Sequence, residues 1–354
     1  MKPKYKTTYH KTKHQQLTTA TLCLTLFLIG QLVTGCGSRP IQEQESDPTS
    51  TKILVTKTPE PTVTPFPRVF DGQRAFQDVE TQLAFGPRTA GSQAHLISGE
   101  WISSELKQAG WQVEIQETIF QGHPVRNIIG KWGQGDPWII LGAHYDSRLV
   151  ADQDPDAQKQ SQAVPGANDG ASGVAVLLEL ARVLPAQLEG NPIQDSAGDG
   201  QKNRRAEQIW IVFFDVEDNG KLPGWDWILG SRAFVASLTE KPDAAIIIDM
   251  IGDRNLNLNF EKSSNMGLNL EIWAAAASEG YSDKFIPQPG SSILDDHRPF
   301  LEAGITAVDL IDFDYPYWHT TADTLDKVSA DSLKAIGDTL LAWLKIGSTM
   351  FSQP

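Results

Sequence analysis

Three short runs of apolar residues constrain the fold of this chain more than any other feature. They occupy residues 137–143 (PWIILGA), 208–214 (QIWIVFF) and 244–251 (AAIIIDMI), and polar residues hardly interrupt them. A strand of this composition is buried on both faces, which is typical of a parallel sheet covered by helices on each side. The runs therefore predict an α/β fold.

Segments with helical spacing separate the apolar runs, as expected when each parallel strand is followed by a crossover helix. This alternation predicts a single-domain three-layer sandwich with a mixed, largely parallel central sheet flanked by helices. In such sheets the active site gathers at the carboxyl ends of the strands. The remaining expected elements are strands at 111–119, 125–132 and 306–312, helices at 72–84, 93–109 (ending at Gly110), 170–185, 228–238, 268–279, 296–303 and 329–347, and a polar surface loop at 189–204.

The N-terminal segment has the pattern of an export signal. A basic stretch precedes an apolar run at 20–33, which is too short for a confident transmembrane helix. The run ends in Val33-Thr34-Gly35-Cys36, which resembles a bacterial lipobox with Cys36 as the lipidated residue. We expect residues 1–36 to be a lipoprotein-type signal peptide. The alternative is an uncleaved membrane anchor, and both export the rest of the chain.

Residues 37–68 form a Pro- and Thr-rich segment that cannot bury enough apolar surface to fold. We expect an extended tether here, followed by one catalytic domain over 69–350. The protein would then be exported and anchored by lipid to a bacterial cell membrane, on its periplasmic or outer-surface side.

Charge and cysteine content exclude several functions. The net charge is -14, although the first 35 residues contain five lysines and no acid, so the remainder is more acidic still. Such a body repels nucleic acid and anionic lipid surfaces but tolerates peptides with a free amino end. Both cysteines, Cys23 and Cys36, lie in the N-terminal segment, so the domain has neither a disulfide nor a thiolate metal site.

Acids and histidines lie where the apolar strands are expected to end. Carboxylates beside apolar strands are costly unless they are paired or bind a cation. Histidine and carboxylate ligands without cysteine suit Zn²⁺ or a similar metal in a catalytic site. These residues are His144, Asp169, Glu217, Asp218, Asp249, Asp295 and His319.

Each residue alone has a simpler explanation. His144 could be a structural hydrogen-bonding residue, Asp169 a helix N-cap, and His319 part of a turn. Residues 217–218 could be a solvated pair, whereas Asp249 has apolar neighbours and is harder to explain in this way. Their recurrence at successive strand ends favours a metal site.

Seven ordered blocks resemble the signature of the M28 metallopeptidase clan, which includes the glutaminyl cyclases. The resemblance covers about residues 70–350 and implies their α/β sandwich fold. The blocks are GAHYDSR (142–148), GANDGASGVAVLLELARVL (166–184), FFDVED (213–218), GSRAF (230–234), IDMIG (248–252), DDHRPFLEAGI (295–305) and YWHTTADTLD (317–326).

The clan's aminopeptidases bind two zinc ions. Carried over to this chain, the resemblance implies one zinc held by His144, Asp169 and Asp249. It implies a second zinc held by Asp169, Asp218 and His319, with Asp169 bridging. The cyclases keep only the second of these zinc ions, so the expected cofactor is one Zn²⁺ or two.

The resemblance also implies catalytic roles. Glu217 would be the general base of an aminopeptidase, or would carry a proton from the substrate amine to the leaving ammonia in a cyclase. In the cyclases the residues matching Asp249 and Asp295 share a hydrogen bond. Asp295 and the tryptophan before His319 favour the cyclase.

The substrate pocket implied by the cyclases has apolar and aromatic walls. The matching residues are Ile293 and Trp318, and either Trp225 or Trp227 supplies a further wall. The expected activity is zinc-dependent conversion of N-terminal Gln to pyroglutamate, with peptides or proteins as partners and a monomeric enzyme. An M28-type di-zinc aminopeptidase is the first alternative. An inactive binding lipoprotein is the second, because Asp218 is one methylene shorter than the usual Glu.

Overall fold

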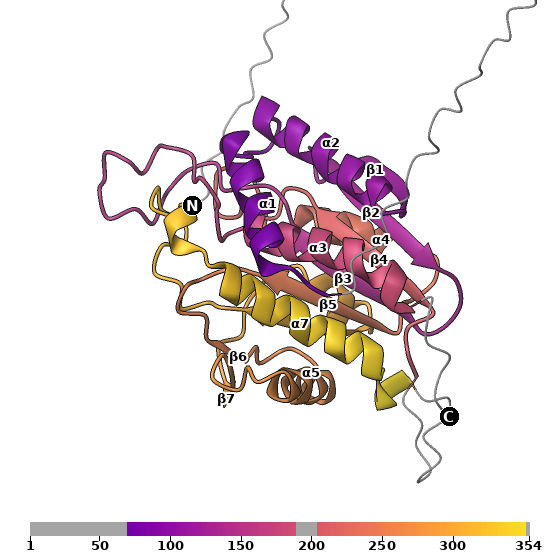
Figure 1. Ribbon diagram of the computed structural model, residues 1–354. Helices are drawn as coiled ribbons and strands as arrows, with labels where there is room; N and C mark the ends of the chain where they lie inside the picture. The colour runs from indigo at the N-terminus through magenta and orange to yellow at the C-terminus, as the bar shows by residue number, and fades with distance from the viewer. Residues whose placement is uncertain (1–68, 189–203, 352–354) are drawn as a thin grey trace, which may run out of the picture. The chain divides into compact units, whose positions relative to one another are not determined.

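The central sheet has six strands in the order β1–β2–β4–β3–β5–β8 (Figure 1). The computed structural model describes residues 69–188 and 204–351. Neighbouring strands are parallel from β4 to β8, whereas β1–β2 and β2–β4 are antiparallel. The mixed, largely parallel sheet expected from the sequence is confirmed. The strands are β1 (Gln112–Phe120), β2 (His123–Gly133), β3 (Trp138–His144), β4 (Gln208–Phe214), β5 (Ala244–Asp249) and β8 (Thr306–Ile311).

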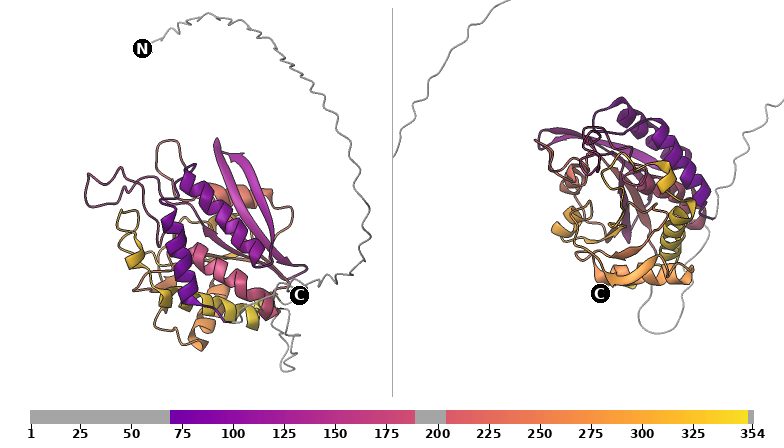
Figure 2. Two further views of the ribbon diagram at one scale, coloured as in Figure 1. Left: turned by 45° about the horizontal axis from the view of Figure 1, so that its top comes forward. Right: turned by 90° about the vertical axis from the view of Figure 1, so that its left-hand side faces the viewer.

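Helices cover both faces of this sheet and complete the predicted three layers. Figure 1 shows α1, α3 and α7 lying together over one face, and Figure 2 shows α2 beside the β1–β2 hairpin. α5 packs against α7 and contributes to the same core as α1, α3 and α7. On the other face α4 and α6 pack together. The helices are α1 (Gly72–Ala84), α2 (Gln93–Gln108), α3 (Ala171–Leu188), α4 (Leu229–Ser237), α5 (Met266–Ser278), α6 (Arg298–Glu302) and α7 (Ala330–Ile346).

The apolar strands have a core on each side, because successive side chains point to opposite faces. In β3, Ile139 and Leu141 join the core under α1, α3 and α7. Trp138 and Ile140 join the smaller core under α4 and α6, where Phe234 and Phe300 pack. Every residue of β3 and β5 is buried, which is the physical reason for their apolar composition up to the terminal His144 and Asp249.

Two strands of a second, two-stranded parallel sheet were not predicted. They are β6 (Leu258–Phe260) and β7 (Phe285–Pro289), which flank α5 in the sequence. β6 has only three residues and β7 contains two prolines, so neither presents a recognisable strand pattern. The helix expected at 296–303 is shorter than predicted, because Pro299 lies in its first turn.

Several predicted segments lie outside the described residues. These are the signal peptide at 1–36, the tether at 37–68 and the loop at 189–204 except Arg204. Arg204 pairs with Ser348 in an isolated antiparallel bridge. Within 69–188 and 204–351, every helix is too short or too polar to cross a lipid bilayer.

A buried cluster of charges joins the first three helices. Arg182 of α3 forms ion pairs with Asp78 of α1 at 2.5 Å, Glu105 of α2 at 2.8 Å and Glu179 of its own helix at 3.1 Å. Burial raises the pKa of Asp78, although the guanidinium opposes this effect. Arg182 therefore neutralises acids that would otherwise repel one another between the helices.

Replacing Arg182 with Met should destabilise the protein by about 3–5 kcal/mol, because the substitution leaves buried carboxylates without a cation. Urea unfolding followed by circular dichroism measures the change. Arg74→Met is the matched control, since Arg74 is half-exposed at 51% and contacts Glu179 only at 3.5 Å. The control should cost less than about 1 kcal/mol. Equal losses in the two variants would contradict the assigned role of Arg182.

Candidate metal centre and active site

The carboxyl ends of the parallel strands bring the predicted site residues together. β3 ends at His144, β5 ends at Asp249, and the turn after β4 carries residues 217–218. Asp169 lies just before α3, and His319 lies in the loop after β8. All of these side chains are buried. Residues far apart in the sequence thus share one edge of the sheet, as expected for this architecture.

Two groups of side chains have the geometry of metal sites. The first is His144, Asp169 and Asp249, and the second is Asp169, Asp218 and His319. Within each group the potential ligand atoms lie within 4.8 Å of one another. These are the two sets that the family resemblance implies.

Asp169 joins the two groups through its separate oxygens. Its Oδ1 lies 3.2 Å from Nε2 of His144, and its Oδ2 lies 3.7 Å from Nε2 of His319. Nε2 of His144 also lies 3.1 Å from Oδ1 of Asp249, and Nε2 of His319 lies 2.9 Å from Oδ1 of Asp218. Asp169 is therefore the residue that the two groups share.

Unpartnered oxygens show that this donor set fits a cation. Oδ2 of Asp218 and Oδ2 of Asp169 are buried and accept no hydrogen bond within the described residues, and Oδ1 of Asp218 lies 2.9 Å from Nε2 of His319. Before any cation binds, burial and the charge of Asp169 raise the pKa of Asp218 to about 6. A divalent cation would remove this penalty, and imidazole with carboxylate is the ligand chemistry of catalytic zinc.

Glu217 lies beside the second metal group but is not one of its ligands. Its side chain lines a cavity of about 200 Å³ together with Asp169, Asp218 and His319. Burial raises the pKa of Glu217 well above its usual value, and the negative charges of Asp218 and Asp295 add to the shift. Glu217 is thus a buried carboxyl group with a raised pKa that lines the cavity beside this metal group.

Two tryptophans wall this cavity beside His319. The ring of Trp318 stacks on His319 with centroids 3.7 Å apart, and Trp227 stacks on it at 5.9 Å. Ile293 also lines the cavity. Trp225, the other tryptophan considered from the sequence, lines a different cavity and stacks on His123 at 3.8 Å. The structure therefore places Trp227, and not Trp225, at the site.

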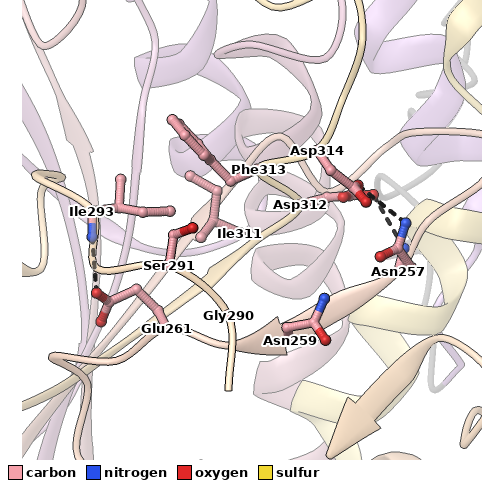
Figure 3. A pocket seen from close by; sticks show the side chains of 10 residues that line it. All are labelled: Asn257, Asn259, Glu261, Gly290, Ser291, Ile293, Ile311, Asp312, Phe313 and Asp314. Atoms are coloured by element: carbon pink, nitrogen blue, oxygen red, sulfur yellow. Dashed lines mark hydrogen bonds between the residues drawn. The ribbon is translucent and has the colours of Figure 1, made fainter. Parts of the chain in front are cut away.

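A second cavity adjoins the first and shares the residues Ile293, Ile311 and Phe313 (Figure 3). Glu261 accepts a hydrogen bond from the backbone N–H of Ile293 at 3.0 Å, which fixes this part of the shared wall. Asp312 and Asp314 lie at the other end of the second cavity, where the backbone and side chain of Asn257 donate to them. The second cavity is therefore acidic.

Asp249 and Asp295 lie in the same cavity, but their contacts differ from the expectation. The hydrogen bond of Asp249 within the described residues joins it to His144 at 3.1 Å, not to Asp295. Burial and the charge of Asp249 raise the pKa of Asp295 to about 7. The two carboxyl groups thus interact through charge in this structure.

A buried histidine with acidic neighbours lies near Asp295. His297 contacts Asp309 at 3.3 Å through Nδ1 and Glu261 at 3.4 Å through Nε2. Burial lowers the pKa of His297, but these acids outweigh burial and raise it to about 10. Asp295, His297 and Asp309 form a third group whose potential ligand atoms lie within 4.8 Å of one another, and the contacts of His297 join this group to Glu261 in one ion network.

Sequence reasoning gave no role to the residues that hold the ligands in place. Asp146 accepts the backbone N–H groups of Glu217 at 3.1 Å and Asp218 at 3.3 Å. Asp323 accepts the backbone N–H of Asp169 at 3.2 Å. Asp146 lies in the block at 142–148 and Asp323 in the block at 317–326. Their place in these blocks was the sequence signal that could have identified them.

Arg148 and Asp152 form a second support. Arg148 binds Asp152 through two nitrogens and donates to the carbonyl oxygen of Asp218 at 3.0 Å. Its guanidinium lies 4.9 Å from the ring centroid of Trp227. Asp152 in turn faces Nδ1 of His319 at 3.5 Å. Arg148 thus contacts the backbone of Asp218, the cavity wall at Trp227, and Asp152, which faces His319.

Backbone strain concentrates around the site. Val216, Met250 and His319 adopt positive φ angles of 47°, 48° and 55°, which are uncommon for residues other than glycine. Ile228, at 57°, donates its backbone N–H to the carbonyl oxygen of Glu217. Each such residue costs about 1–3 kcal/mol and persists only where its surroundings fix it. The site is therefore held rigidly.

Asp152→Asn should weaken binding of Zn²⁺ by about 10- to 100-fold, because it removes the negative charge that orients His319 and holds Arg148. Competition with a zinc chelator measures the dissociation constant without reference to activity. Asp156→Asn, an exposed change in the same loop, is the control and should leave affinity unchanged. Unchanged affinity in the Asp152 variant would contradict this role.

Comparisons with known proteins agree with this geometry. The model of peptidase family M28 matches residues 127–344, more than half of the chain. The Escherichia coli protein YfbL, described as uncharacterized, is 34% identical over 47% of this chain and 45% of its own length. Aminopeptidase YwaD of Bacillus subtilis is 30% identical over 58% of this chain. The match covers 40% of YwaD, so this chain spans less than half of either relative.

Other relatives are glutaminyl cyclases. The glutaminyl-peptide cyclotransferase of Drosophila melanogaster is 27% identical over 71% of this chain and 75% of its own length. The solved glutaminyl cyclase of Bacteroides thetaiotaomicron, bound to N-acetylhistamine, has a TM-score of 0.70 and 31% identity, covering 80% of this chain and all of that one. A leucine aminopeptidase precursor from the same organism has a TM-score of 0.71 and 30% identity, covering 81% and 100%. From its family match, its fold and its metal-site geometry, this chain belongs to peptidase family M28.

Proposed function

We propose that this protein is a zinc-dependent glutaminyl-peptide cyclotransferase, which converts N-terminal Gln to pyroglutamate and releases ammonia. The observation that carries the proposal is the cavity beside His319. Trp227 and Trp318 wall it, and Asp295 lies with Glu217 in its lining. Such a cavity accepts a small side chain and an amino terminus.

Glutaminyl cyclases among the similar proteins support this activity. Cyclases from fly and cattle align with 71% and 70% of this chain. Solved bacterial cyclases from Tannerella forsythia and Bacteroides thetaiotaomicron are 32% and 31% identical to it. These matches cover the described domain rather than a fragment of it.

Glu217 would perform the proton transfers of the reaction. The α-nitrogen of the substrate attacks its own γ-amide carbon, and a five-membered ring closes. Glu217 takes the proton from the amine and delivers it to the leaving ammonia. Zinc held by Asp169, Asp218 and His319 would supply a Lewis acid for the amide carbonyl.

The remaining residues of the cavity would orient the substrate. Asp249 and Asp295 present carboxyl groups to its amino end, and the two tryptophans restrict the side chain. Both reacting groups belong to one residue, so holding them in place is a large part of the catalysis. The backbone contacts of Asp146 and Arg148 keep Glu217 and Asp218 fixed while the substrate reacts.

A specific observation favours a second candidate, a di-zinc aminopeptidase. His144 and Asp249 form a complete ligand group with Asp169 and lie 3.1 Å apart. A zinc ion there would give the paired metals that activate water in hydrolytic enzymes. The zinc content and the products distinguish the two candidates.

We also propose, from the N-terminal sequence alone, that the enzyme is exported and anchored by a lipid on Cys36. The Pro- and Thr-rich segment would hold the domain away from the membrane. This location would bring the cavity into contact with extracytoplasmic peptides.

Purified protein should form pyroglutamate from Gln-peptides and release little leucine from Leu-p-nitroanilide, because the proposed reaction is intramolecular and needs no activated water. Mass spectrometry detects the loss of ammonia, absorbance detects hydrolysis, and elemental analysis should find one zinc per chain. Release of leucine without pyroglutamate, with two zinc ions bound, would replace the cyclase by the aminopeptidase.

Glu217→Gln should lower kcat by about 10²- to 10⁴-fold, because the amide cannot accept the proton. Bound zinc and the thermal midpoint should stay at wild-type values, which separates lost chemistry from lost folding. A fully active variant with zinc bound would refute the role of Glu217.

Trp227→Ala should lower kcat/KM for Gln-peptides by about tenfold or more, since the side chain supplies an apolar wall worth about 1.5–3 kcal/mol when covered. Trp225→Ala is the matched control, because this tryptophan lies in the same loop but lines another cavity. If the two variants lose activity equally, the position of the pocket wall is wrong.

A further inference from the structure

The reaction cavity contains a cation that the proposed chemistry does not use. Lys221 lines the cavity and is exposed to solvent. Every other ionisable side chain in the lining is a carboxyl group or the imidazole of His319, and no second Lys or Arg contributes to it. Within the part of the chain that the structure describes, the Lys221 side chain makes no ion pair or hydrogen bond.

The loop that carries Lys221 is fixed. Arg148 donates to the carbonyl oxygen of Gly220 at 3.2 Å. Gly220 packs flat against the ring of Trp227, because an added Cβ would lie only 2.0 Å from it. Lys221 itself adopts a φ of 63°, in the left-handed region that most residues avoid. A strained residue on a fixed loop at a site is a feature of functional positions.

The surroundings of Lys221 distinguish its side of the cavity from the others. Exposed apolar side chains of Leu294 and Phe313 lie in the same lining. Beyond Phe313, the adjoining cavity presents Asp312 and Asp314 and has no Lys, Arg or His in its lining, so it offers an anion no cationic partner (Figure 3). Lys221 lines the reaction cavity but not this neighbour. An anionic group of a bound molecule that extends out of the cavity therefore has one favourable partner in the lining, the ammonium group of Lys221.

We propose that Lys221 selects substrates with a carboxylate immediately after the N-terminal residue. The inference rests on the proposed action at peptide N-termini. The N-terminal residue occupies the cavity, so the next residue lies at its mouth, beside Lys221. The carboxylate is the side chain of Glu or Asp at the second position, or the free C-terminus of a dipeptide. Lys221 is thus a specificity-determining residue and takes no part in the proton transfers.

The size of the effect follows from the exposure of the lysine. A solvent-exposed ion pair changes an equilibrium by about two- to fivefold, and salt screens it. We expect this preference in kcat/KM for Gln-Glu-Ala-amide over Gln-Gln-Ala-amide, with a change in KM rather than kcat. Gln-Lys-Ala-amide should be the poorest of the three. The differences should shrink in 1 M salt.

Substitution of the lysine provides the test. Lys221→Gln should remove the preference, and Lys221→Glu should reverse it in favour of Gln-Lys-Ala-amide. Lys107→Gln is the control with the same change of net charge, because Lys107 is exposed on the last turn of α2, outside the cavity. Comparison of Gln-Ala with Gln-Ala-amide, in the wild type and in Lys221→Gln, measures the contribution of a C-terminal carboxylate separately.

The outcomes separate this inference from the proposed function. Active enzyme with equal kcat/KM for the three peptides, or with no reversal in Lys221→Glu, overturns the role of Lys221 and leaves the cyclase intact. Leucine release without cyclisation overturns the cyclase, and the same series with N-terminal Leu then measures the preference. Absence of both activities from zinc-loaded protein overturns both proposals.

Discussion

The burial of several carboxylates at one end of an apolar sheet is the constraint on which this structure depends. Asp169, Asp218 and Asp249 lie within a few ångströms of two imidazoles and are almost completely shielded from water. Like charges at this distance repel strongly where water is excluded. The fold accommodates them in part through backbone N–H groups and histidines, and a cation would complete the compensation.

Much of the surrounding structure serves to keep this cluster in place. The backbone around Glu217 is held by Asp146, Arg148 and Ile228, so the acid faces the cavity in one orientation. Positive φ angles at neighbouring residues show that the strand ends are forced into shape by their contacts rather than by local preference. A rigid scaffold of this kind favours reactions in which positioning matters more than the reactivity of the catalytic groups.

The sheet and the candidate site residues could be predicted because they depend on local patterns, whereas the division of these residues into two ligand sets came from the family resemblance. Residues buried on both faces must be apolar, and the strand ends then mark where polar side chains meet. Trp225 and Trp227 could not be told apart, since their roles depend on a loop path that the pattern does not specify. Asp152 was missed for a related reason: it lies in an irregular loop, and only tertiary structure brings it to His319. β6 is too short to show a period, and the prolines of β7 hide its strand pattern.

The two-sided position of Asp169 has a consequence for the history of such enzymes. Each oxygen of Asp169 lies near a different imidazole. Asp169, Asp218 and His319 therefore form a complete ligand set whether or not a second ion is bound at His144. A lineage could therefore gain or lose hydrolytic chemistry by altering one half of the centre while the other half continued to work. A family whose members catalyse different reactions is the expected result of one carboxylate that belongs to two ligand groups.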